Sequence, residues 1–230
     1  MDKLTIIRNF SRHAHTYDRY ALIQKQAARE LLAQIKENTF ARILEIGCGT
    51  GNYTILLRER FKNARLKAVD ISEEMIEIAV KKLKDKGVEF MVADAENMEL
   101  NEDFDFITSN ACFQWFSDLE KALIFYKSLL KKEGVISFSV FGPSTFWELD
   151  TALKCCAKKI SASSSNFIGK EKLEVILKEN FKGVELREAI YEEKFSCLEE
   201  LLYKIKYTGV GGNHLGGKKF FTPRLLNKLE

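Results

Sequence analysis

The sequence predicts an α/β fold, with a mostly parallel β-sheet covered by helices on both faces and a helical arm in front of it. Three observations support this prediction. From about residue 40 to 140, short apolar runs alternate with helical patterns, which is typical of a parallel sheet. The first run ends in alternating glycines, as at a strand-to-helix turn beside a ligand. The chain of 230 residues is long enough for one such domain with a substantial core.

The arm and the strands follow one another along the chain. The arm covers residues 1–38, and its apolar or aromatic positions are Phe10, Ala14, Tyr17, Ala21 and Ile23. Five short apolar runs are predicted to be strands, at residues 41–46, 66–70, 88–92, 104–109 and 135–140.

The helices between these strands carry start and stop signals. Ser72 is a good N-cap for the helix after the second strand, and Gly87 is expected to end that helix. Ser117 and Glu120 read as a capping box for a helix that runs to Leu130.

The pattern is looser after the fifth strand. Helices are predicted at about residues 144–159, at 170–180 and near 198–207, with a strand at 184–195. We expect a single domain, made of the arm (1–38), a ligand-binding core (39–141) and a C-terminal part (142–230).

Composition excludes several classes of protein. The net charge of +3 is too small to argue for a nucleic-acid partner. No apolar run approaches the ~18 residues of a membrane span, and the first residues do not form a secretory segment. The five cysteines form no Cys-x-x-Cys pair, and an odd count argues against a disulfide framework. We therefore expect a reduced, cytoplasmic location, no membrane or nucleic-acid partner, and no metal site.

The glycine turn after the first strand allows two interpretations. A dinucleotide site requires Gly-x-Gly-x-x-Gly, but the glycines here are at 47, 49 and 51, and Asn52 stands where the third glycine would be. Glu45 precedes the turn, and the spelling Glu-x-Gly-x-Gly-x-Gly resembles the first motif of class I S-adenosylmethionine (SAM)-dependent methyltransferases. This resemblance implies a Rossmann-like methyltransferase fold, SAM as cofactor, and a role for Glu45 in positioning the SAM amino group. A glycine-rich loop without a ligand is the alternative.

Further polar residues stand where parallel strands end, which is where ligands bind in open α/β sheets. Asp70 ends the second strand, and its carboxylate can accept hydrogen bonds from both hydroxyls of a ribose. It could instead cap the next helix, but Ser72 already serves there. Asp94, after the third strand, resembles the family's residue near the adenine amino group. The predicted cofactor site comprises Glu45, Gly47, Cys48, Gly49, Gly51, Asp70, Ile71, Asp94, Ala95 and Asn110.

Several segments together carry a closer resemblance. They are residues 10–18 with Ala21 and Gln24, the glycine turn, 110–115, 146–149, 208–210 and 221–226. In combination they resemble the malonyl-[acyl-carrier protein] O-methyltransferases of biotin synthesis. The resemblance implies methyl transfer from SAM to the free carboxylate of a malonyl thioester on acyl carrier protein, or on coenzyme A. Methylation of another small carboxylate or alcohol, or a non-catalytic SAM-binding scaffold, are the alternatives. The segment 110–115 lacks the Asn-Pro-Pro-Tyr spelling of enzymes that methylate exocyclic amines of bases.

The proposed reaction needs few catalytic groups. A malonyl carboxylate is ionised near neutral pH, so alignment and desolvation replace a general base. The acceptor-side candidates are Tyr17, Arg12, Asn110, Gln114 and Trp115. Arg12 is a candidate cation for the acceptor carboxylate but is also an ordinary surface charge. Tyr17, and less strongly Gln24, could close over the cofactor. Phe113 and Trp115 line the acceptor pocket or belong to the core, and both interpretations stay open.

Two further expectations concern the C-terminal part. Class I methyltransferases end in an antiparallel strand, yet nothing remains after residues 221–230 to form one, so we expect that strand to be missing. An acidic carrier protein would require a basic docking face. Lysines that could supply it are Lys154, Lys158, Lys159, Lys170 and Lys172, although such spacing is most often a solvated face.

Overall fold

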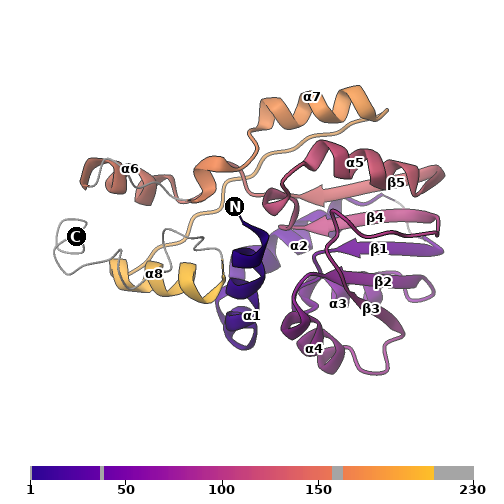
Figure 1. The fold of residues 1–230 in the computed structure, drawn as a ribbon, viewed down its shortest axis with the longest axis horizontal. Helices are drawn as coiled ribbons and strands as arrows, with labels where there is room; N and C mark the ends of the chain where they lie inside the picture. Colours follow the sequence, from indigo (N-terminus) through magenta and orange to yellow (C-terminus); the bar gives the residue numbers. More distant parts are fainter. Residues whose placement is uncertain (1, 37–38, 157–162, 210–230) are drawn as a thin grey trace. The chain divides into compact units, whose positions relative to one another are not determined.

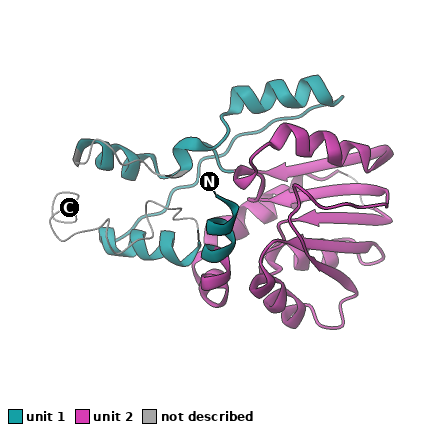
Figure 2. Ribbon diagram, in the orientation of Figure 1, with its two compact units in different colours: residues 1–9, 141–230 teal, residues 10–140 magenta. Residues whose placement is uncertain are grey.

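A computed structural model describes residues 2–36, 39–156 and 163–209 of the chain (Figure 1). The chain divides into two compact units, one of residues 10–140 and one of residues 1–9 with 141–230 (Figure 2). We describe each unit by itself, and the single domain expected from the sequence stays a prediction.

The unit of residues 10–140 is built on a parallel five-stranded sheet, as predicted. The strands are Arg42–Ile46 (β1), Arg65–Asp70 (β2), Val88–Val92 (β3), Phe104–Asn110 (β4) and Leu130–Ser139 (β5). Their spatial order is β3-β2-β1-β4-β5, and each neighbouring pair is parallel. The order reverses between β1 and β4, so a crevice is expected at the carboxyl ends of these two strands.

The start of β5 corrects the sequence-based prediction. The preceding helix was expected to run to Leu130 and to be closed by residues 131–134, but Leu130 already pairs with Phe104 of β4. The next paired positions are Val135 and Phe106, so the residues between them form an irregularity in the strand. Extra residues in one strand are tolerated as a bulge, which local sequence signals do not reveal.

Helices occupy the connections and precede the sheet. In this unit they are the part of α1 (Lys3–Tyr20) from residue 10 on, α2 (Leu22–Gln34), α3 (Asn52–Arg60), α4 (Glu73–Lys82), α5 (Leu119–Ser128) and the short 3₁₀ helix η1 (Phe113–Trp115). Ser72 caps α4 as predicted, since its hydroxyl accepts a hydrogen bond from Met75 N at 3.2 Å. The helix ends at Lys82, before Gly87 is reached.

The cap of α5 differs from the prediction. Asp118, and not Ser117, accepts the hydrogen bond from Lys121 N, at 3.0 Å. The backbone N–H groups of Ser117 and Asp118 both donate to the carboxylate of Glu96, at 2.8 and 2.9 Å. This distant carboxylate holds Ser117 outside the helix, so the helix starts one residue later.

The core lies on both faces of the sheet, as predicted. On one face Ile43, Leu66 and Phe106 are cross-strand neighbours and pack against Leu31 of α2 and Leu57 of α3. Ile76 of α4 packs on Ala68, which has the same strand parity as Leu66 and therefore lies on the same face. On the opposite face the ring of Phe138 lies 5.0 Å from that of Phe113, which stacks on Tyr126 of α5 at 5.8 Å.

The described part of the other unit is helical, with α6 (Trp147–Cys156), α7 (Lys170–Asn180), α8 (Leu198–Tyr207) and the 3₁₀ turn η2 (Ser163–Asn166). A small cluster of Leu149, Leu153 and Ile205 joins α6 to α8. The strand predicted at 184–195 is wrong, because these residues form no regular structure. A strand needs a neighbour to hydrogen-bond, and the described residues of this unit include none.

The expectation that the final antiparallel strand is missing concerns the end of the chain, residues 221–230, which lie outside the described residues. The described strands are all parallel to their neighbours. No helix in the described ranges is long and apolar enough to cross a membrane.

Candidate active site

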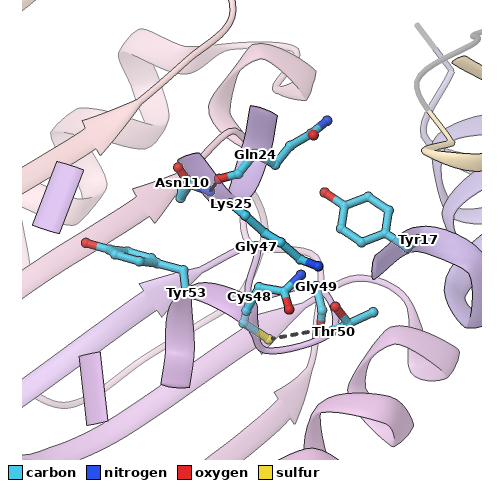
Figure 3. A pocket seen from close by; sticks show the side chains of 10 residues that line it. Tyr17, Gln24, Lys25, Gly47, Cys48, Gly49, Thr50, Tyr53 and Asn110 are labelled. Carbon is cyan, nitrogen blue, oxygen red and sulfur yellow. Dashed lines mark hydrogen bonds between the residues drawn. The ribbon is translucent and has the colours of Figure 1, made fainter. Parts of the chain in front are cut away.

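A hollow adjoins the glycine turn, next to the end of β4 (Figure 3). Its lining comes from α1, α2, the turn, α3 and β4, and consists of Tyr17, Gln24, Lys25, Gly47, Cys48, Gly49, Thr50, Asn52, Tyr53 and Asn110. The arm and the core of the chain therefore share one site, which lies where the topology predicts a crevice.

The three glycines of the turn have different roles. A Cβ atom at Gly47 would lie 2.3 Å from Cys112 Sγ, and one at Gly51 would lie 2.6 Å from Leu83 Cδ1. A Cβ at Gly49 would meet nothing within 4 Å. All three have positive φ, which glycine adopts without strain. Gly47 and Gly51 thus allow close packing, while Gly49 leaves the backbone bare beside the hollow.

The N–H groups of Gly47, Cys48 and Gly49 already donate hydrogen bonds within the chain. Gly47 N and Cys48 N both donate to Val69 O, at 2.8 and 3.0 Å. Gly49 N donates to Asp70 Oδ2 at 2.8 Å. The turn is therefore tied to β2, and it offers a ligand close approach to the backbone instead of a cradle of N–H donors for a pyrophosphate.

Asp70 lies at the end of β2 and orders the turn. Besides Gly49 N, its carboxylate accepts a hydrogen bond from Ser72 N at 2.9 Å, so it also forms the turn into α4. Burial raises the pKa of Asp70, and these backbone hydrogen bonds partly oppose the rise. A carboxylate has about four acceptor positions, so these bonds leave room for a hydroxyl group of a ligand.

Glu45, two residues before the glycine turn, is not among the residues that line the hollow, and its side chain is buried, with 1% of its surface exposed. Its Oε2 atom has no hydrogen-bond partner. Burial, together with the nearby charge of Asp70, raises the pKa of Glu45 to about 8. A buried acceptor without a partner costs free energy, so this position favours a ligand that brings a cation or a donor.

The arm and β4 meet through amide groups. Asn110 Nδ2 donates to Gln24 O at 3.0 Å, and Asn110 Oδ1 accepts from Ser139 Oγ at 2.8 Å. Both ends of the Asn110 side chain thus join α2 to β5. Gln24 lines the hollow, and its Oε1 atom is buried without a hydrogen-bond partner.

Aromatic side chains join the arm to the segment after β4. The ring of Phe10 lies 6.3 Å from that of Tyr17 and 5.8 Å from that of Trp115, both edge to face. Tyr17 faces the hollow in Figure 3, and burial raises the pKa of its phenol. Phe113 belongs to the core, because it is 1% exposed, whereas Trp115 is only half-buried.

Several predicted residues lie outside this hollow. Arg12 is exposed on α1. Asp94 accepts hydrogen bonds from Glu96 N and Asn97 Nδ2, at 3.1 and 2.6 Å, and so shapes its own turn. The carbonyl oxygen of Ala95 accepts from Tyr126 OH at 2.7 Å. Ile71 is half-buried next to Asp70, and Gln114 is buried with its Nε2 bonded to Ala111 O at 2.8 Å.

Sequence reasoning missed four residues that line the hollow, Lys25, Thr50, Asn52 and Tyr53. Lys25 lines the hollow and donates to Asp18 O at 2.6 Å. Thr50, inside the glycine turn, donates to the Asp18 carboxylate. The only signal for them was their proximity in sequence to Tyr17, Gln24 and the glycines.

Two of the lysines that were expected to form a docking face have carboxylate partners. Lys154 pairs with Asp150 at 2.5 Å and Lys170 with Glu188 at 3.0 Å, so these two expected docking lysines are engaged within their own unit. Lys158 and Lys159 lie outside the described residues. In the described part of the chain, no group of three or more His, Cys, Asp or Glu residues is arranged to hold a metal.

Comparison with known proteins adds the following relatives. A family model described as a methyltransferase domain matches residues 43–134. Malonyl-[acyl-carrier protein] O-methyltransferase 2 of Ilyobacter polytropus is 37% identical, over 100% of this chain and 89% of that protein. Malonyl-[acyl-carrier protein] O-methyltransferase of Acetivibrio thermocellus is 35% identical, over 93% and 81%.

Solved structures are similar as well. An S-adenosylmethionine-dependent methyltransferase from Clostridium acetobutylicum matches with a TM-score of 0.50 and 29% identity, over 60% of this chain and 59% of that one. A SAM-dependent methyltransferase from Thermotoga maritima, described as a possible histamine N-methyltransferase, matches with a TM-score of 0.56 and 25% identity, over 76% and 80%.

Proposed function

Because this chain belongs to the family of malonyl-[acyl-carrier protein] O-methyltransferases, whose cofactor is SAM, we propose that it methylates the free carboxylate of a malonyl thioester. The thioester is carried by acyl carrier protein, and the product is the methyl ester that starts pimeloyl and biotin synthesis. The observation that carries the proposal is the buried carboxylate of Glu45, whose Oε2 atom has no hydrogen-bond partner, just before the glycine turn.

Polar residues around the glycine turn and at the ends of β2 and β3 fit the polar groups of SAM. Glu45 is suited to the amino group, because a cation would satisfy its orphan oxygen and lower its pKa. Asp70 has room left to accept a hydrogen bond from a ribose hydroxyl. We assign Asp94, Ala95 and Ile71 to the adenine side, since they follow β3 and β2 at the same edge of the sheet.

Lys25 is the residue that we assign to bind a ligand carboxylate in the hollow, either that of SAM or that of the malonyl group. It lines the hollow, while Arg12, the candidate from the sequence, is exposed on α1. Its ammonium group has three donors, and the bond to Asp18 O uses one of them.

SAM supplies an activated methyl group on a sulfonium cation. The protein has to align the acceptor carboxylate with it and exclude water, because the carboxylate is already ionised near neutral pH. Tyr17 and Gln24 from the arm, with Trp115 beside Phe10, supply the walls that exclude water. No general base is required of the protein, and Asn110 acts by holding the arm helix α2 against β5.

The acceptor test uses methyl-labelled SAM and matched acceptors. We expect label to be transferred to malonyl-acyl carrier protein and released by mild base as a methyl ester. Acetyl-acyl carrier protein, which lacks the free carboxylate, is the matched control and should stay unlabelled. Malonyl-coenzyme A shows whether the carrier protein is needed. We place the reaction in the cytoplasm, where both thioesters are made.

The outcomes separate the alternatives. SAM binding without transfer to either malonyl thioester would contradict the substrate assignment and leave another carboxylate or an alcohol as acceptor. Turnover with any acceptor would eliminate a non-catalytic scaffold.

A further inference from the structure

Asp18, on the arm helix α1, contacts three segments that lie far away in sequence. Its Oδ1 accepts from Thr50 Oγ1 at 2.5 Å and from Asn52 Nδ2 at 2.8 Å. Its Oδ2 pairs with Lys82 Nζ at 2.7 Å. Thr50 belongs to the glycine turn, Asn52 begins α3 and Lys82 ends α4. One carboxylate therefore ties the arm to the turn and to two helices of the core.

The four side chains form a closed cluster. Lys82 Nζ also donates to Asn52 Oδ1 at 3.0 Å and lies 3.4 Å from Thr50 Oγ1. The side chains of Lys82 and Asp18 are 23% and 36% exposed, so this ion pair is better shielded than an ordinary surface pair. Burial alone would raise the pKa of Asp18, but the hydrogen bonds from Lys82, Thr50 and Asn52 outweigh it and hold the pKa below its ordinary value.

The cluster adjoins the hollow through its own members and their neighbours. Thr50 and Asn52 line the hollow. Tyr17, the residue before Asp18, faces the hollow, and Lys25 donates from α2 to the backbone carbonyl of Asp18. If Asp18 moved away from the core, the ring of Tyr17 and the ammonium of Lys25 would both lose their support.

We propose that Asp18 is a positioning residue for cofactor binding, which holds Tyr17 and Lys25 of the arm over the glycine turn through Thr50, Asn52 and Lys82. The inference rests on the proposed function and adds a residue to it. Asp18 does not touch the reacting atoms. Its hydrogen bonds and ion pair fix the position of the arm next to the glycine turn.

The test measures SAM binding by calorimetry, without any acceptor, in the full-length chain. Asp18→Asn keeps the size of the side chain but removes its charge, and we expect the Kd for SAM to rise about tenfold. With saturating SAM, kcat should stay within about threefold of the parent, because positioning acts on binding. Lys82→Met should have a similar effect, and the double variant should be little worse than either one. Lys81→Met is the matched control, since Lys81 is exposed on the same helix and pairs with Glu77 at 3.8 Å.

A fluorescence titration gives a second measure of SAM binding, from a tryptophan next to the arm. In a Trp147→Phe background, Trp115 is the remaining tryptophan, and it contacts Phe10 of the arm. We expect SAM to change its emission at lower concentration in the parent than in Asp18→Asn. Equal Kd values for the parent, Asp18→Asn and Lys82→Met would overturn the inference while leaving the proposed function intact. A parent that binds no SAM would overturn the proposed function, and this inference with it.

Discussion

The glycine turn and two buried acceptor side chains at the site differ in how well their polar atoms are satisfied. In the turn, the N–H groups of residues 47–49 all bond to Val69 or Asp70 of β2. In contrast, Oε1 of Gln24, which lines the hollow, and Oε2 of Glu45, which lies just before the turn, are buried without a hydrogen-bond partner. The hydrogen bonds of these turn groups are complete as folded, whereas the two oxygen atoms have lost hydration without gaining bonds. The difference indicates a rigid support in the turn and acceptors that a ligand can complete.

The largest effect is expected in the glycine turn, where Gly47→Ala should lower the stability of the fold. The new Cβ would meet Cys112 at 2.3 Å and would sit at a φ of +71°. Overpacking and left-handed backbone strain together should lower the free energy of unfolding by about 3 kcal/mol. Urea denaturation measures it. Gly49→Ala is the matched control, because it meets no atom within 4 Å and should cost only about 1 kcal/mol. Equal losses for both variants would contradict the division of roles within the turn.

The second prediction concerns Glu45, whose Oε2 atom has no hydrogen-bond partner. Glu45→Gln keeps the shape of the side chain but removes the charge expected to pair with the SAM amino group. We expect SAM affinity to fall about a hundredfold in calorimetry, since an ion pair shielded from water is lost. Gln26→Glu, which changes an exposed amide on α2 by the reverse substitution, should leave affinity unchanged. Unchanged affinity in Glu45→Gln would show that the orphan oxygen does not serve the cofactor.

The same substitution should have the opposite effect on stability without ligand. Burial raises the pKa of Glu45 to about 8, while in the unfolded chain it is near 4.3. Between these values the unfolded chain releases a proton that the folded chain retains, so the carboxyl group lowers stability as the pH rises through this window. Glu45→Gln should therefore be about 2 kcal/mol more stable than the parent at pH 8, with little difference at pH 5. Thermal unfolding at both pH values checks this, and a gain that is equal at both would refute the assigned cause.

The smallest effect is expected from the cation at the hollow. Lys25→Met roughly keeps the length of the side chain but removes the ammonium group. We expect it to weaken binding of one ligand about tenfold. The loss should appear in the Kd for SAM if Lys25 holds the cofactor carboxylate, and in the KM for the acceptor if it holds the malonyl carboxylate. Arg12→Met should change neither value, because Arg12 is exposed on α1. A larger effect at Arg12 than at Lys25 would restore the candidate from the sequence.

The sheet and the motif were predictable because both depend on local patterns. Alternating apolar runs identify the five strands, and the spacing of Gly47, Gly49 and Gly51 after Glu45 points to the kind of cofactor. The predictions were wrong where a residue far away in the sequence determines the local structure. Glu96 holds Ser117 outside α5, and the residues at 184–195 lack a neighbouring strand among those described in their unit.

The sequence by itself determined the α/β order, the glycine turn and the carboxylates at the strand ends, because helix and strand periods extend over only a few residues. Only the tertiary structure decided which polar groups are satisfied. Asp18 meets partners 32, 34 and 64 residues away, Asp94 is used by its own turn, and Oε2 of Glu45 is left without a partner. Such outcomes depend on how distant elements pack and compete for hydrogen bonds, which no local pattern records.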